Sequence, residues 1–203
     1  MLKDKDVSDE MYQQLRREFS NHANGEEFLL EKIADEQDEI VQGDLLHILG
    51  TYKYRRHRCL KRTAEFARQF IASQSVYLRK KGIIVLGWIG EKSDVEIIAE
   101  AMFNDENEEN RGWAATGLMQ LFFHKPAIKN QCLRNLQAAL ATEKSYFTLS
   151  CILISIQEIA GKQWGISSTG RPEREPERSI DMAKPEAISF LERYFEQMPQ
   201  ADK

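Results

Sequence analysis

Residues 78–90 read LRKKGIIVLGWIG, and this stretch decides the fold. Its apolar residues recur every three or four positions, as on the buried face of an α-helix. Two glycines, Gly82 and Gly87, lie within the stretch, although a glycine inside a helix costs on the order of 1 kcal/mol relative to alanine. Close packing of two helix backbones offsets this cost. The stretch therefore predicts a helix that packs tightly against a neighbouring helix.

Similar stretches recur along the chain. Residues 45–50 read LLHILG, residues 111–118 read RGWAATGL, and residues 154–161 read ISIQEIAG. When the copies are aligned on Leu49, Leu86, Leu118 and Ile156, they are 37, 32 and 38 residues apart. A period of this length is typical of helical-repeat proteins, in which each repeat buries its apolar face against its neighbours.

The repeated stretch resembles the second helix of HEAT-like repeats in their short bacterial form, which reads roughly V-R-x-x-A-A-x-A-L-G-x-I-G. Residues 91–98, EKSDVEII, are similar to the D-P-x-A-V-x-x-L opening of a following repeat. The resemblance covers residues 25–161. Tetratricopeptide repeats have a similar period, but the order Leu86-Gly87-Trp88 does not match their signature. The resemblance implies an all-α solenoid of about four helical hairpins with capping helices at both ends.

The apolar periodicity also predicts the bounds of the helices. We expect hairpins at 25–54, 55–90, 94–123 and 126–161, a capping helix near 8–22, and a terminal helix near 185–198. Pro185 suits the first turn of that terminal helix. All five prolines follow residue 125, and no sustained apolar alternation of a β-strand is present. We therefore expect one all-α domain over residues 1–203.

One segment, residues 161–184, interrupts the repeat. It reads GKQWGISSTGRPEREPERSIDMAK and contains Gly, Ser, Pro and alternating Arg and Glu. Because it offers few apolar groups to bury, we expect a long mobile insertion, with disorder over about 167–180. Trp164 is unusual in such a segment and can pack on the last hairpin.

Composition limits the class of protein. The chain has 203 residues, 42% of them hydrophobic and 30% charged, with a net charge of −4. These values are typical of a globular protein and weaken the case for a nucleic-acid partner. No apolar run is long enough to span a membrane, and the start MLKDKDVSDE lacks a secretory signal, so we expect a cytoplasmic protein. Three cysteines in apolar contexts agree with reduced core thiols.

The resemblance implies that the second helices line a concave side, where three rows of side chains face a partner. The rows are Asp44, Lys81, Trp113 and Cys151; His47, Ile84, Thr116 and Ile154; and Thr51, Trp88, Gln120 and Glu158. The candidate protein-binding residues are Asp44, His47, Lys81, Trp88, Trp113 and Gln120. Tryptophan often anchors protein interfaces, which favours Trp88 and Trp113. The alternative is that both rings pack between repeats.

A secondary candidate site is the basic run at residues 52–62. Two tyrosines interleave with its cations, which are Lys53, Arg55, Arg56, Arg58, Lys61 and Arg62. Such a patch can bind phosphates or an acidic protein surface. The alternative is a solvated turn and helix face that the acidic segment 26–44 neutralises.

Motifs of catalysis are not found in the sequence, and its four histidines share no metal-ligand spacing. We expect no catalytic residue, no metal and no cofactor. The HEAT-like alkylpurine DNA glycosylases resemble this architecture, but they use a cationic concave face, and Lys81 alone is basic among the twelve row positions. We therefore expect a non-catalytic protein-binding module, either an adaptor or an inhibitor such as the immunity partner of a toxin. A nucleic-acid-acting protein similar to those glycosylases is the alternative.

Overall fold

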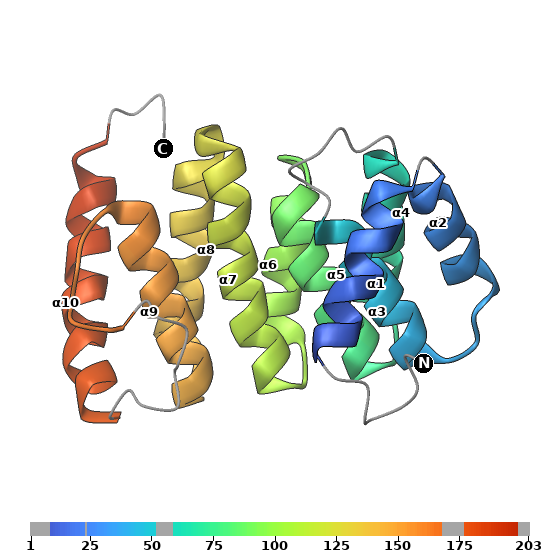
Figure 1. Ribbon diagram of the computed structural model, residues 1–203. Helices are drawn as coiled ribbons and strands as arrows, with labels where there is room; N and C mark the ends of the chain where they lie inside the picture. Colours follow the sequence, from blue (N-terminus) through green and yellow to red (C-terminus); the bar gives the residue numbers. More distant parts are fainter. Residues whose placement is uncertain (1–8, 23, 52–58, 168–176, 199–203) are drawn as a thin grey trace. The chain divides into compact units, whose positions relative to one another are not determined.

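The computed structural model describes residues 9–22, 24–51, 59–167 and 177–198. Over these residues the chain forms ten α-helices and no β-strand, which confirms the all-α prediction (Figure 1). The helices group into two compact units, residues 1–90 and residues 91–203. A single domain over 1–203 stays a prediction, and each unit is described by itself.

The first unit contains two helical hairpins that follow an N-terminal helix. Its elements are α1 (Asp9–Asn21), α2 (Gly25–Asp35), α3 (Glu39–Gly50), α4 (Leu60–Ile71) and α5 (Val76–Ile89). Helix α2 packs on α3, α4 packs on α5, and the two second helices, α3 and α5, pack on each other. The helices lie within the bounds expected for the capping helix and the first two hairpins.

The second unit has the same pairing. Its elements are α6 (Asp94–Asn104), α7 (Glu108–His124), the short 3-10 helix η2 (Pro126–Ile128), α8 (Lys129–Thr142), α9 (Tyr146–Ala160) and α10 (Glu177–Glu196). Helix α6 packs on α7, α8 packs on α9, and the second helices α7 and α9 are neighbours. Helix α10 packs against both α8 and α9 at the end of the chain.

Each second helix begins at a polar N-cap. The side chain accepts a hydrogen bond from a backbone N–H of the first turn, which has no partner within the helix. The caps are Asp38 for α3, Ser75 for α5, Asn107 for α7 and Ser145 for α9. They are 37, 32 and 38 residues apart, the same steps as in the sequence alignment. The aligned copies are therefore equivalent positions counted from the start of each helix.

Gly82 shows why α5 needs a small residue at this position. A Cβ atom at this position would lie 2.6 Å from the Ala67 carbonyl oxygen and 2.8 Å from the Ile71 nitrogen. Both atoms belong to the backbone of α4, so the α4 and α5 backbones are in direct contact at this point. This is the close packing that the sequence predicts.

The last helix corrects one prediction. Helix α10 begins at Glu177, so a start at Pro185 was wrong, as was disorder at 177–180 and an irregular insertion up to 184. A proline inside a helix costs about 3 kcal/mol, because it removes one hydrogen bond and crowds the preceding turn. A buried stripe that continues across the proline offsets this cost, and it comprises Ile180, Ala183, Ala187 and Leu191. Residues 168–176 lie outside the described residues, and the prediction for them is not tested.

Residues 161–167 are held to the end of α9 by the buried side chain of Gln157. Its Oε1 accepts from the backbone N–H groups of Trp164 at 2.8 Å and Ile166 at 3.3 Å. Its Nε2 donates to the Ile166 carbonyl oxygen at 3.0 Å. The Trp164 ring packs edge-on against Phe190 of α10, with 5.5 Å between ring centroids. Trp164 therefore packs between the end of α9 and α10.

Candidate functional site

The rows predicted from the sequence lie on one half-exposed face in each unit. Counted from the N-cap of its helix, every row member is the sixth, ninth or thirteenth residue, and all twelve are half-buried. Every residue between the sixth and the thirteenth that belongs to no row is buried. We name the two surfaces the α3–α5 face and the α7–α9 face.

Four of the predicted residues meet on the α3–α5 face, namely Asp44, His47, Lys81 and Trp88. Lys81 of α5 lies between α3 side chains, because its Nζ is 3.0 Å from Asp44 Oδ1 and 3.2 Å from His47 Nδ1. Tyr77 completes the cluster, since its hydroxyl donates to the same Asp44 oxygen at 2.6 Å. The ammonium group of Lys81 also lies 5.0 Å from the centroid of the Tyr77 ring. The positive charge of Lys81 is thus matched by Asp44 within the face.

His47 is a neutral member of this cluster. Burial, and to a lesser extent the neighbouring Lys81 charge, lowers its pKa to about 4. At neutral pH the imidazole is therefore uncharged, and its Nδ1 can accept a hydrogen bond from Lys81. The ring lies beside that of Trp88, with 5.1 Å between the centroids. Trp88 therefore packs against α3 through His47 and is half-exposed as a residue.

The same glycine–aromatic contact builds the face in both units. A Cβ at Gly43 would lie 2.7 Å from Tyr77 Cε1, and a Cβ at Gly112 would lie 2.6 Å from Phe147 Cε1. In each unit the glycine is the fifth residue after the N-cap of the first of the two second helices. The aromatic residue is the second residue after the N-cap of the other second helix. Tyr77 and Phe147 were not among the predicted site residues, and this recurring pair of positions is the sequence signal that could have found them.

The α7–α9 face is more apolar than the α3–α5 face. Trp113 is half-exposed, and its Nε1 donates a long hydrogen bond of 3.5 Å to Glu109 Oε1. The Cys151 sulfur lies beside Gly112, where an added Cβ would approach it to 3.1 Å. Burial raises the pKa of the Cys151 thiol to about 11, so the thiol is neutral. Gln120 is half-buried further along α7, in the row that includes Glu158.

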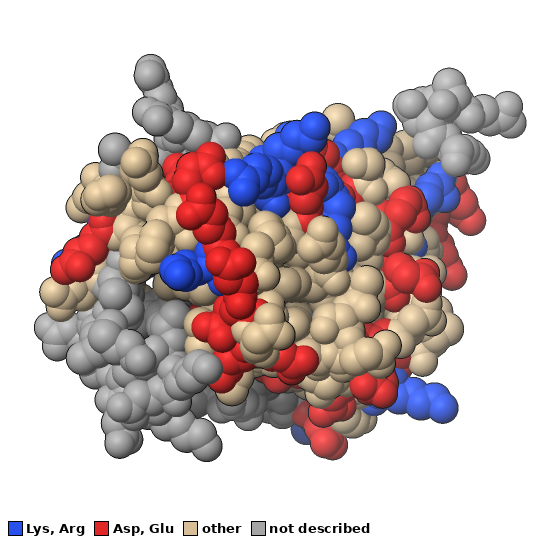
Figure 2. All heavy atoms as spheres, turned by 90° about the vertical axis from the view of Figure 1, so that its right-hand side faces the viewer, with Lys and Arg blue, Asp and Glu red and all other residues tan. Residues whose placement is uncertain are grey.

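The basic run is only partly within the described residues. Lys53, Arg55, Arg56 and Arg58 lie outside them, whereas Lys61 and Arg62 are exposed at the start of α4. Arg62 forms an ion pair with Glu27 of α2. Figure 2 looks onto the side on which α2 lies and shows a band of acidic side chains, with Lys and Arg gathered near its upper edge. The Arg62–Glu27 pair agrees with the interpretation that acidic residues neutralise this run.

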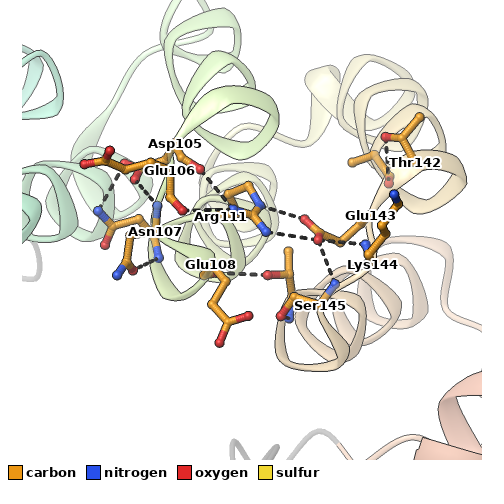
Figure 3. A network of polar contacts seen from close by, with 12 residues as sticks. Asp105, Glu106, Asn107, Glu108, Arg111, Thr142, Glu143, Lys144 and Ser145 are labelled. Carbon is orange, nitrogen blue, oxygen red and sulfur yellow. Dashed lines mark hydrogen bonds and ion pairs between the residues drawn. The ribbon is translucent and has the colours of Figure 1, made fainter.

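Arg111, the first residue of the stretch RGWAATGL, makes hydrogen bonds with two turns. Its guanidinium donates to Glu143 Oε2 at 2.7 Å and Oε1 at 3.1 Å, and to the Asp105 carbonyl oxygen at 3.0 Å. These bonds join the turn before α7 to the turn before α9 (Figure 3). Arg79 is the equivalent residue of α5 and donates to the Ser73 carbonyl oxygen at 3.2 Å. Each arginine therefore binds the turn before its own helix, and Arg111 also binds the turn before α9.

Comparisons with known proteins give no match: no family model, no curated protein and no solved structure is similar to the chain. Within the described part of the chain, no helix combines the length and apolar character that a membrane crossing requires.

Proposed function

We propose that this chain is a HEAT-like helical-repeat solenoid that binds another protein through the rows on its second helices and catalyses no reaction. One observation carries the proposal. All twelve row positions are half-exposed, while every residue between them along the same helices is buried. A buried core beneath a regular row holds the exposed side chains in fixed positions, and such preorganisation lowers the entropy cost of binding.

The aromatic residues of the faces support a protein partner. Trp88 packs beside His47, and Trp113 lies one turn along α7 from Glu109, so each ring is held by neighbours and keeps an exposed part. Half-buried, supported tryptophans are the residues that most often carry binding energy at protein interfaces.

The charges of the α3–α5 face favour a protein over a nucleic acid. Nucleic-acid affinity depends on several cations that replace the counterions of phosphates. Lys81 is the basic residue of the rows, and its ammonium group pairs with Asp44 at 3.0 Å, with the two side chains only 13% and 18% exposed. To contact a phosphate group, Lys81 would have to leave its ion pair with Asp44. The overall charge of −4 suits a basic protein partner, as an immunity-type inhibitor or an adaptor would have.

The test uses Trp88→Ala and Trp113→Ala, with the binding partner isolated on the wild-type chain and then purified. We expect each change to weaken binding at least ~10-fold per folded molecule. Lys61→Ala combined with Arg62→Ala is the control and should have a smaller effect. If the tryptophan changes only lower the melting temperature and leave affinity unchanged, the rings are packing residues and the proposal fails. Submicromolar binding of duplex DNA that depends on residues 53–62 would favour the nucleic-acid alternative.

A further inference from the structure

The α7–α9 face differs from the α3–α5 face in its charge. We take the second, sixth, ninth and thirteenth residues after the N-caps of α7 and α9, all of which are half-exposed or exposed. These eight residues are Glu109, Trp113, Thr116, Gln120, Phe147, Cys151, Ile154 and Glu158. Four of them are apolar, two are acidic, and none is Lys or Arg. We call this set the apolar–acidic platform.

The apolar part of the platform is centred on Trp113 and Phe147. The Phe147 ring lies against the Gly112 backbone, where any side chain would collide with it at 2.6 Å. Gly112 directly precedes Trp113 on α7, so Phe147 packs on α7 one residue before Trp113. Both remain half-exposed within the described second unit.

The acidic residues lie near opposite ends of the two helices. Glu109 is in the first turn of α7, and Glu158 is in the last turn of α9. Glu109 also acts on the platform itself: the Cys151 pKa is raised mainly by burial and additionally by the negative charge of Glu109. The platform positions include no Lys or Arg, whereas the rows of the first unit include Lys81, which pairs with Asp44.

We propose that the apolar–acidic platform binds an amphipathic segment of a partner protein with lysine or arginine on both sides of an apolar side chain. The apolar side chain packs on Trp113 and Phe147, and the flanking cations pair with Glu109 and Glu158. This inference rests on the proposed protein-binding function and adds the chemistry of the partner. Charge complementarity of this kind raises association rates and excludes acidic partners.

The probe is a pair of synthetic 14-residue amphipathic peptides, one of leucine and lysine and the other of leucine and glutamate at the same positions. The full chain has three tryptophans, so its indole N–H groups give three resonances that Trp→Phe variants assign. We expect the leucine–lysine peptide to shift the Trp113 resonance saturably and to leave Trp88 and Trp164 in place. The leucine–glutamate peptide should shift none of them.

Charge variants test the acidic contribution. Glu109→Gln combined with Glu158→Gln should weaken the leucine–lysine peptide about 3- to 10-fold, because each is an exposed or half-exposed ion pair of modest strength. The matched control is Glu91→Gln combined with Glu96→Gln, which removes two acidic charges at residues outside the platform rows of the same unit. This control should leave the affinity unchanged.

Several outcomes overturn the inference. In the titrations, these are the absence of any Trp113 shift, equal Trp113 shifts with both peptides, and shifts of Trp88 or Trp164 as large as that of Trp113. In the variants, it is the same affinity for the leucine–lysine peptide in the Glu109/Glu158 variant and in the Glu91/Glu96 control. These results leave the proposed function standing. That proposal fails when Trp88→Ala and Trp113→Ala leave the affinity for the natural partner unchanged, or when duplex DNA binds through residues 53–62.

Discussion

Replacing Glu143 by glutamine tests whether the Arg111–Glu143 pair stabilises the second unit. The side chains of this pair are 20% and 9% exposed, and the carboxylate also accepts from the N–H groups of Lys144 and Ser145, each at 2.8 Å. Removing one partner of a fully buried pair costs about 3–5 kcal/mol, whereas a surface pair contributes about 0–1 kcal/mol. Glutamine keeps one acceptor oxygen and loses the charge, so we expect a loss of about 2 kcal/mol.

The assay is urea unfolding at pH 7, with a thermal melt beside it. For a chain of this length, about 2 kcal/mol corresponds to a decrease in Tm of about 4–8 °C. Glu91→Gln is the matched control, because it removes an ion pair with Lys125 whose side chains are 61% and 36% exposed. We expect that control to cost under about 0.5 kcal/mol.

The pH dependence gives a second measurement on the same pair. Burial alone would raise the pKa of Glu143, but hydrogen bonds from Arg111 and from the N–H groups of Ser145 and Lys144 outweigh it and lower the pKa. A carboxyl whose pKa is lower in the folded state stabilises the fold above its unfolded pKa and loses this effect as pH falls through the folded value. The difference between wild type and Glu143→Gln should therefore be full near pH 7 and shrink below about pH 4.3. A difference that stays constant from pH 7 to 3.5, or one no larger than that of Glu91→Gln, would refute the reasoning.

Three further outcomes are expected. Gly82→Ala should destabilise the chain by about 3 kcal/mol in urea, because its Cβ would meet the backbone oxygen of Ala67 at 2.6 Å; a neutral effect would show that α4 and α5 separate easily. Gly161→Ala should cost about 1 kcal/mol through its φ of 68° alone, since no atom lies within 4 Å of the added Cβ, and Gly161→Asn should cost less. Burial raises the pKa of Cys132 to about 12 and those of Cys59 and Cys151 to about 11, so all three thiols should react slowly with Ellman's reagent at pH 8 until denaturant is added; rapid reaction of any thiol in the native chain would contradict this expectation.

Helix positions were predictable because the information is local. The apolar period and the small residues of 78–90 define α5, and the polar residue eleven positions before Leu86 turned out to be its N-cap, Ser75. The start of α10 was not predicted, since Pro185 is equally compatible with a first turn and with an exposed position inside a helix. The stripe from Ile180 to Leu191 distinguishes the two, and its burial depends on contacts with α8 and α9 that no local pattern shows.

The candidate site was predictable in position and less so in chemistry. A constant distance from each N-cap is enough to place Asp44, His47 and Lys81 on one face, because equivalent residues of successive second helices point the same way. Lys81 and Asp44 hold the same position in successive second helices, whereas the contacts of Tyr77 with Asp44 and of Lys81 with His47 join residues 33 and 34 positions apart and required the register between α3 and α5. Sequence spacing alone does not specify which side chains neutralise one another.

The buried side chain of Gln157 has a consequence for mutational tolerance. Its amide pairs with the peptide of Ile166 as one strand edge pairs with another, offering a donor to the carbonyl and an acceptor to the N–H. Glutamate would place an oxygen against that carbonyl, and leucine would leave both backbone groups of Ile166 without a hydrogen-bond partner. In a saturation library of residues 152–159, position 157 should therefore accept almost nothing but glutamine, although it follows the apolar run CILISI, where aliphatic exchanges survive.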